Sequence, residues 1–445
     1  MAQTDRNTDK AWQRGALLRD RNFGWMMAGG VLSMLGDQFT LIALPWLVLQ
    51  MTGDTLVLGT VLALVSVPRA LFMLLGGALV DRYSPKRVMM LTKYINTVLL
   101  GALAALVLTN HLSLWAVYLL SAAIGVATAF SIPAGTSMLP RVVPAQLLQP
   151  ANGLMLGMRQ LSMFLGPLLA GLLIAISGDA PVPGAVHAVA GAAHAVAGAT
   201  GIGLAFAFDA FSFAASAWTL SQVRELPLAA SAHHAAPTAV FASVAQGLRH
   251  FWRDAELRTC FLYWGALAVL IMGPVHLALP VLANTQPGLG AAALGVMLAA
   301  HGAGTLGGMV LSGMLPKVRF GSLGTTILVF DAVVALLFMP MGHVHAAWQG
   351  AGLMLAIGLL GGFMQVSVFT WIQQRVPPAL LGRAMSLFMF IFMGLVPMAA
   401  AVTGWVMRSV TLVQLFAGCG ALLLALVVFA ALGTPMRNVR ERQPA

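Results

Sequence analysis

Residues 24–50 read GWMMAGGVLSMLGDQFTLIALPWLVLQ, a long apolar run that contains a single ionisable side chain, Asp37. A helix of about 20 apolar residues crosses the hydrocarbon core of a bilayer. Such a helix satisfies its own backbone hydrogen bonds where no water is present to do so. The run therefore predicts a membrane-spanning helix with one carboxyl group near its middle.

The composition of the whole chain agrees with this first run. Of 445 residues, 59% are hydrophobic and only 8% are charged, whereas a soluble protein has about 25% charged residues. An ordinary water-soluble enzyme is therefore excluded. The net charge of +11 does not indicate nucleic acid, because the cations lie between apolar runs rather than clustering on one water-facing surface. We expect a lipid bilayer as the surroundings and no nucleic-acid partner.

Eleven further runs of similar length follow the first. The predicted spans are 24–50, 57–79, 88–108, 113–138, 152–177, 201–222, 259–283, 290–312, 322–341, 348–372, 384–406 and 410–432. The fold class that they predict is an all-α membrane protein with twelve transmembrane helices. An even number of spans places both termini on one side of the membrane.

A polar stretch, 224–258, divides the spans into six and six, and short motifs recur across it. Gly77-Ala-Leu-Val-Asp81 after the second span resembles Gly313-Met-Leu-Pro-Lys317 after the eighth. The repetition favours two pseudo-symmetric six-helix halves, an architecture in which transporters bind their substrate between the repeats. The predicted domains are an N-terminal tail 1–22, a first bundle 23–223, a linker 224–258, a second bundle 259–433 and a C-terminal tail 434–445.

Basic residues show which side is the cytoplasm. Of the 24 Lys and Arg residues, 21, including Lys93, are assigned to the ends and alternate loops of one side, and only Arg408 to the other. Cytoplasmic loops carry the excess of Lys and Arg. We therefore expect a multi-pass protein of the cytoplasmic membrane with both termini in the cytoplasm. Arg69 and Arg159 are the two cations placed inside spans.

The loop after the second span carries a family resemblance. It reads Gly77-Ala-Leu-Val-Asp81-Arg82-Tyr-Ser-Pro-Lys86-Arg87, and with twelve spans in two halves it resembles the signature loop of the major facilitator superfamily. The resemblance implies that these glycine, acidic and basic residues form a gate, in which Asp81 latches against the start of span eleven. Ser and Pro before Lys86 depart from the family pattern. A basic loop that only orients the protein is the alternative.

Other stretches resemble the drug:proton antiporter branch of that superfamily, with its macrolide and enterobactin exporters. They are Gly36-Asp37, Ile42-Ala-Leu-Pro-Trp46, Ala151-Asn152-Gly153, Gly166-Pro167, Asp209-Ala210 and Gly382-Arg383. The resemblance implies a monomeric secondary transporter that exports a small amphipathic compound in exchange for protons. Alternatives are a siderophore, lipid or metal-chelate exporter, an uptake carrier and, less favoured, a membrane receptor or enzyme.

Ionisable groups inside spans are costly and so mark candidate functional residues. An apolar setting disfavours the charged form of a carboxyl group, which makes Asp37 the candidate for proton coupling, with Arg69 or Arg159 as its partner. Asp209 and Asp331 are expected to make structural pairs or caps, with proton coupling as the alternative. His301 lies among glycines, where close helix packing and a proton relay are both open.

Polar and aromatic side chains inside the spans are candidates for contact with substrate. They are Gln38, Trp46, Asn96, Trp264 and Gln365. No metal or cofactor is expected. Cys260 and Cys419 are far apart in the sequence, the His187 and His194 repeat is a weak signal, and the chain contains no phosphate-loop or His-Glu-x-x-His motif.

Overall fold

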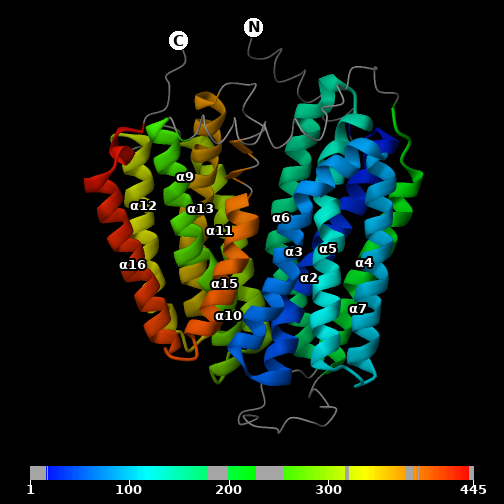
Figure 1. The fold of residues 1–445 in the computed structure, drawn as a ribbon, viewed down its shortest axis with the longest axis horizontal. Helices are drawn as coiled ribbons and strands as arrows, with labels where there is room; N and C mark the ends of the chain where they lie inside the picture. The colour runs from blue at the N-terminus through cyan, green and yellow to red at the C-terminus, as the bar shows by residue number, and fades with distance from the viewer. Residues whose placement is uncertain are drawn as a thin grey trace. The chain divides into compact units, whose positions relative to one another are not determined.

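The computed structural model describes most of the chain. The described residues are 17, 19–177, 199–226, 252, 254–315, 320–376, 384, 385, 387, 388 and 390–439, without the side chains of 73–82, 145 and 199. Within these ranges the regular structure is helical throughout, as Figure 1 shows. The all-α class expected from the sequence is therefore confirmed for the part of the chain that the structure describes.

The described helices follow one another along the chain. They are α2 (Arg21–Thr52), α3 (Thr55–Arg82), α4 (Pro85–Leu108), α5 (Leu114–Met138), α6 (Leu148–Ile176), α7 (Ala199–Gln222), α9 (Ala255–Leu267), α10 (Gly273–Thr285), α11 (Gly290–Met314), α12 (Leu323–Phe338), α13 (Ala347–Arg375), α15 (Val396–Val406) and α16 (Leu412–Gly433). Among the described residues, 11 helical stretches are long and apolar enough to cross a membrane. The chain is thus a multi-pass membrane protein.

The described helices match the predicted spans with two differences. The predicted seventh span is two helices, α9 and α10, joined by a π turn at Ala268–Met272, and together they cover Ala255–Thr285. The predicted eleventh span corresponds to a shorter apolar helix, Ile391–Val406, because part of 377–389 lies outside the described residues. Twelve spans in two halves therefore remain a prediction.

Both π turns have the same local cause. Ala268–Met272 is followed by Pro274, and Ile391–Leu395 is followed by Pro397. Proline has no backbone N–H to bond to the carbonyl of the preceding turn. The hydrogen-bond register of the helix shifts there by one residue, and a single wide turn accommodates the shift.

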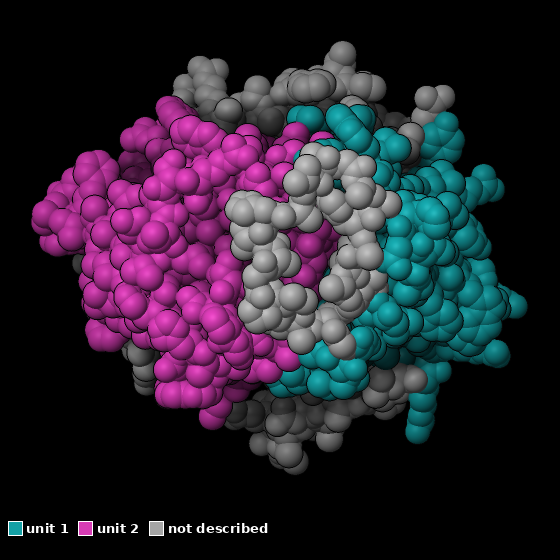
Figure 2. All heavy atoms as spheres, turned by 90° about the horizontal axis from the view of Figure 1, so that it is seen from below, with its two compact units in different colours: residues 1–44, 68–179, 191–234 teal, residues 45–67, 180–190, 235–445 magenta. Residues whose placement is uncertain are grey.

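Contacts divide the chain into two compact units, which Figure 2 distinguishes by colour. Unit 1 comprises 1–44, 68–179 and 191–234, and unit 2 comprises 45–67, 180–190 and 235–445. The division runs through α2 before Pro45 and through α3 before Pro68. The end of α2 and the beginning of α3 therefore group with the second unit, whereas the domain bounds expected from the sequence remain a prediction.

Polar bonds attach this segment, 45–67, to the rest of unit 2. Arg408 donates a hydrogen bond of 2.8 Å to Asp54, and Thr55 Oγ1 donates one of 3.1 Å to the carbonyl of Gly404. Gln50 Nε2 donates to Asn284 Oδ1 at 3.0 Å. A Cβ atom at Gly404 would lie 2.5 Å from the Thr55 carbonyl oxygen. Hydrogen bonds and a glycine contact thus hold the junction of α2 and α3.

The carboxylate of Asp54 lies outside the spans, between α2 and α3. Partial burial alone would raise the pKa of Asp54, but hydrogen bonds from Arg408 and backbone amides, together with the charge of Arg408, outweigh burial, so that its pKa lies below the ordinary value of 3.8. A carboxyl group with a lowered pKa in the folded state stabilises that state at higher pH. The stabilisation disappears as the pH falls through the lowered pKa.

We predict that Asp54→Asn and Arg408→Gln each increase hydrogen exchange of the backbone amides of residues 54–58. The expected loss is about 1 kcal/mol or less, because both side chains are partly exposed and screened by water. Hydrogen-exchange mass spectrometry of the parent should show that the backbone amides of these residues are still protected from exchange at pH 5. The double variant should lose no more protection than either single variant. A loss in the double variant equal to the sum of the two single losses would contradict a direct interaction between Asp54 and Arg408.

Candidate functional site

Asp37 lies near the middle of α2, in unit 1, with its side chain exposed. Its carboxylate interacts electrostatically with Lys93 of α4 and, more weakly, with Arg69 of α3. Among the described residues, none makes a hydrogen bond or a close ion pair with Asp37. A carboxyl group held by charge rather than by fixed hydrogen bonds is free to gain and lose a proton.

Lys93 is the functional candidate that the sequence analysis missed. It was counted among the loop cations, and this assignment is wrong, because α4 begins at Pro85 and Lys93 lies about 12 Å further along the helix axis. Its side chain is only 4% exposed. Lys93 Nζ donates a 3.2 Å hydrogen bond to Ser33 Oγ and lies 5.5 Å from the ring centroid of Phe213. The predicted span 88–108 already contained this residue.

Asp209 of α7 is the second carboxylate in the same region and is only 1% exposed. Thr40 Oγ1 donates a 2.5 Å hydrogen bond to its carboxylate, and Ser212 Oγ donates one of 3.2 Å. A Cβ atom at Gly36 would collide with the carboxylate of Asp209 and the hydroxyl of Ser212. The glycine of the Gly36-Asp37 pair therefore lets α7 bring its carboxylate against α2.

The four ionisable residues form what we call the charge cluster: Asp37, Arg69, Lys93 and Asp209. Lys93 interacts with both carboxylates, whereas Arg69 interacts with Asp37. In their ionised forms these residues carry two positive and two negative charges, and such a balance lowers the cost of placing ions in an apolar interior. Arg159 of α6 is exposed and takes no described part in the cluster. The cations beside Asp37 are thus Lys93 and Arg69.

The remaining coupling candidates lie in unit 2. Tyr263 Oη donates a 2.7 Å hydrogen bond to Asp331, and both side chains are buried. The imidazole of His301 hydrogen-bonds the backbone of Met354. Its Nδ1 atom has no partner in the described part of the chain. These residues are not part of the charge cluster, which is confined to unit 1.

The substrate candidates fall into two groups. Trp46 and Trp264, both buried, and Gln365, which is exposed, belong to unit 2, and Trp264 stacks edge-on against other aromatic rings. Gln38 and Asn96 belong to unit 1. Asn96 is 1% exposed, and neither of its amide atoms has a partner among the described residues. Contact of these five side chains with substrate remains a prediction.

The gate predicted at Gly77, Asp81 and Arg82 falls on the last turns of α3, whose side chains lie outside the described residues, as do Gly382 and Arg383. The neighbouring Lys86 is described. Its Nζ donates hydrogen bonds to the carbonyls of Ser221 and Val223 at 3.2 and 2.6 Å. These carbonyls lie at the end of α7, where a helix favours a positive charge. The gate itself remains a prediction.

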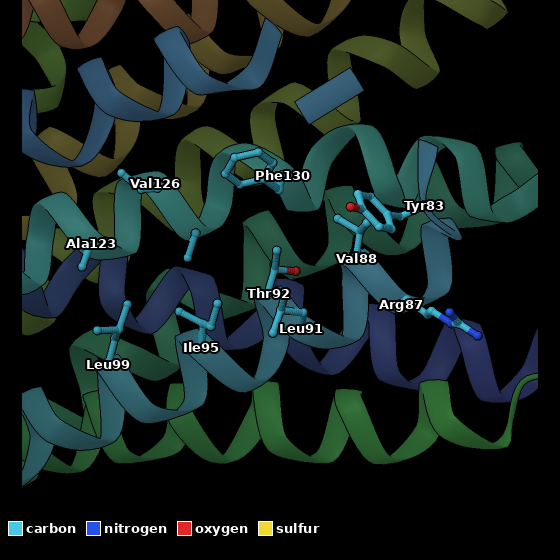
Figure 3. Close-up of a pocket in the computed structure, with 11 residues that line it drawn as sticks. Tyr83, Arg87, Val88, Leu91, Thr92, Ile95, Leu99, Ala123, Val126 and Phe130 are labelled. Atoms are coloured by element: carbon cyan, nitrogen blue, oxygen red, sulfur yellow. The ribbon is translucent and has the colours of Figure 1, made fainter. Parts of the chain in front are cut away.

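Figure 3 shows a pocket of about 590 Å³ between α4 and α5. Its lining is largely apolar, with Leu91, Ile95 and Phe130 along it and Tyr83 and Arg87 at one end. No member of the charge cluster lines this pocket. Within the described ranges, no group of three His, Cys, Asp or Glu residues is placed to hold a metal ion, and His187 and His194 lie outside those ranges.

Comparison with known proteins identifies relatives over most of the chain. The family model described as Major Facilitator Superfamily matches residues 26–401. An uncharacterized MFS-type transporter, y4rN of Sinorhizobium fredii, is 25% identical over 91% of this chain and 93% of its own length. Multidrug efflux pump Tap of Mycolicibacterium fortuitum is 27% identical over half of each chain. Macrolide efflux protein A of Streptococcus pyogenes is 26% identical over 35% of this chain and 38% of its own.

Solved structures share the fold at low sequence identity. A bacterial homologue of the iron transporter ferroportin, in an inward-facing state, has a TM-score of 0.67 at 16% identity, covering 93% of this chain and 98% of its own. The nucleoside transporter NupG has a TM-score of 0.65 at 16% identity, with coverage of 92% and 98%. At these identities the likeness concerns the fold alone.

We predict that Gly36→Ala destabilises the protein by about 1 to 3 kcal/mol, because a methyl group forced into a packed contact displaces its neighbours. The measurement is the melting temperature in detergent. Gly24→Ala, on the same helix and with open space around the added Cβ, is the matched control and should melt like the parent. Equal melting temperatures for the two variants would contradict the close contact between α2 and the carboxylate of Asp209.

Proposed function

Because the chain belongs to the Major Facilitator Superfamily, we propose that it is a secondary active transporter that exports a small amphipathic compound in exchange for protons. Asp37 is the proposed coupling residue. The observation that carries this proposal is an exposed carboxylate near the middle of an apolar helix, flanked by the charges of Lys93 and Arg69 and held by no described hydrogen bond.

Coupling requires that the proton affinity of Asp37 depend on what lies near it. When Asp37 is ionised, it attracts Lys93 and Arg69, and when it binds a proton, it attracts neither. A proton taken up on the acidic side therefore releases a cation, and loss of that proton to the cytoplasm restores the attraction. Only such a differential interaction can shift a conformational equilibrium. The proton is thus exchanged once in each transport cycle.

The proposed cargo and direction follow from the relatives. Tap is named a multidrug efflux pump and macrolide efflux protein A an efflux protein, and both names point to export. The 26 methionines of the chain, whose side chains are flexible and polarizable, suit the adaptable apolar surface that bulky amphipathic ligands require. We propose further that the protein acts as a monomer without a cofactor, and that Asp81 latches the inward gate.

We predict that Asp37→Asn, which resembles the protonated form, keeps substrate binding but abolishes efflux driven by a proton gradient. The measurement uses inverted membrane vesicles and a panel of amphipathic dyes and a macrolide, with and without an imposed gradient. Asp37→Glu keeps the carboxyl group and is the control, which should retain dependence on the gradient. If Asp37→Asn transports like the parent with the same dependence, then Asp37 is structural.

A second prediction concerns the orientation of the chain. The predicted topology places Phe320, before α12, in the cytoplasm and His343, after α12, outside. Both side chains are exposed. In a variant with Cys260 and Cys419 replaced by serine, His343→Cys should react with a membrane-impermeant thiol reagent in intact cells, whereas Phe320→Cys should react only after the cells are opened. The reverse pattern would overturn the orientation.

A further inference from the structure

We propose that Lys93 and Asp209 form a fixed pair of opposite charges that sets the pH at which Asp37 exchanges its proton, with Lys93 favouring the ionised form and Asp209 the protonated form. The proposal rests on the proposed function, because it assigns two positioning residues to the coupling carboxylate. Neither residue needs to contact substrate. Both act through the electric field at Asp37.

One face of α2 holds all three charges in place. Ser33, Asp37 and Thr40 follow one another at spacings of four and three residues, which places them on the same side of the helix. Ser33 accepts the hydrogen bond from Lys93 of α4, and Thr40 donates one to Asp209 of α7. The cation and the second carboxylate are thus fixed on either side of Asp37 by the helix that carries it.

Burial prevents the two flanking charges from leaving. Lys93 is 4% exposed and lies against the ring of Phe213, and Asp209 is 1% exposed and accepts hydrogen bonds from two hydroxyl groups. Burial disfavours the charged form of the Asp209 carboxylate, whereas the hydrogen bonds from Thr40 and Ser212 and the charge of Lys93 favour it. Asp37, by contrast, is exposed and has no described hydrogen bond. We therefore assign the exchangeable proton to Asp37, whose side chain is exposed, and the fixed charge to the buried Asp209.

The second carboxylate lets Asp37 be neutralised without isolating the buried lysine. If Asp37 were the sole counter-charge, binding a proton there would leave an unpaired buried ammonium group, which is strongly unfavourable. Asp209 keeps Lys93 paired in both states. Protonation of the Asp37 carboxylate moves one proton from water to one oxygen atom, and the charge cluster goes from neutral to one positive charge. The group that loses its partner is Arg69, which is less buried than Lys93.

Few other charges reach this site. Within the described residues, the charges of Lys93 and Arg69 act on Asp37, and the carboxylates of Asp37 and Asp209 interact with each other. From α5, which packs along α4, Ser131 donates a hydrogen bond to Thr92, and both side chains are uncharged. The effects of Lys93 and Asp209 on Asp37 can therefore be separated by single substitutions.

The test compares Lys93→Met with Asp209→Asn. Removing the cation should shift the pH midpoint of gradient-driven transport upward, and removing the second carboxylate should shift it downward, each by about 1 to 3 pH units. The double variant should return near the parent midpoint, because it removes one charge of each sign. Lys93→Arg keeps the charge and should stay close to the parent.

The matched control uses another pair of opposite charges in unit 1. Arg141 and Glu225 lie 3.4 Å apart and are partly exposed, Arg141 at the end of one helical stretch and Glu225 after the end of α7. Arg141→Met and Glu225→Gln should leave the transport midpoint where it is in the parent. Shifts of Lys93→Met and Asp209→Asn in the same direction, or no shift in either, would overturn the proposal.

A second measurement does not require transport. The infrared band of the protonated carboxyl group that disappears in Asp37→Asn is titrated in purified protein, for the parent and the Lys93 and Asp209 variants. If the infrared midpoints of the Lys93 and Asp209 variants shift in opposite directions but transport by the parent does not depend on the proton gradient, this inference is supported and the proposed function is refuted. If transport depends on the proton gradient and requires Asp37, but the infrared midpoints of the Lys93 and Asp209 variants equal that of the parent, the inference is refuted and the proposed function is not.

Discussion

A lysine buried in an apolar bundle is the constraint on which the arrangement of unit 1 depends. An ammonium group cannot be taken out of water unless other groups replace its hydration. For Lys93 these are the hydroxyl of Ser33, the face of Phe213 and the charges of Asp37 and Asp209. They come from α2 and α7, so both helices must approach α4 closely.

Glycine residues of α2 make the close approach of α2 and α7 possible. A Cβ atom at Gly29 would collide with the hydroxyl of Thr219, and one at Gly36 with Ser212 and Asp209. The two glycines are seven residues apart and so face α7 together, two turns apart on α2. The same contact that packs the helices brings a carboxylate to the lysine. A substitution at this interface is therefore expected to change both the packing of the two helices and the charges near Lys93.

Unit 2 uses close packing without such a cluster. Gly304 and Gly308 of α11 and Gly358 and Gly362 of α13 leave no room for a Cβ atom against the facing backbone. Asp331 is satisfied by the hydroxyl of Tyr263 alone. In the described residues, a balanced set of buried charges is thus a property of unit 1, although short motifs repeat in both halves of the sequence.

The sequence predicts the helices well because length and apolar content decide them, and it singles out Asp37 because a carboxyl group inside a span is rare. It could not choose between Arg69 and Arg159, because the choice depends on how α3 and α6 are rotated about their axes. Lys93 was missed because a cation near the beginning of a span resembles a loop residue. Asp209 was expected to pair structurally, and its closeness to Asp37 depends on Gly36, a contact that one sequence does not reveal.

The prolines inside α2 and α3 mark positions where these two helices are less resistant to bending. The first segment of unit 1 ends at Leu44 and the second begins at Pro68, so Pro45 and Pro68 stand at two of the points where the chain passes between units. A proline inside a helix removes one backbone hydrogen bond and lowers the resistance to bending. Asp37 lies two turns before Pro45, on the side of the charge cluster, and Asp54 lies beyond it, on the side of the Arg408 bond. Since exposed ion pairs contribute little and buried charged groups resist losing their partners, the bond between Asp54 and Arg408 holds its end of α2 less strongly than the buried contacts of Ser33 with Lys93 and of Thr40 with Asp209 hold the other.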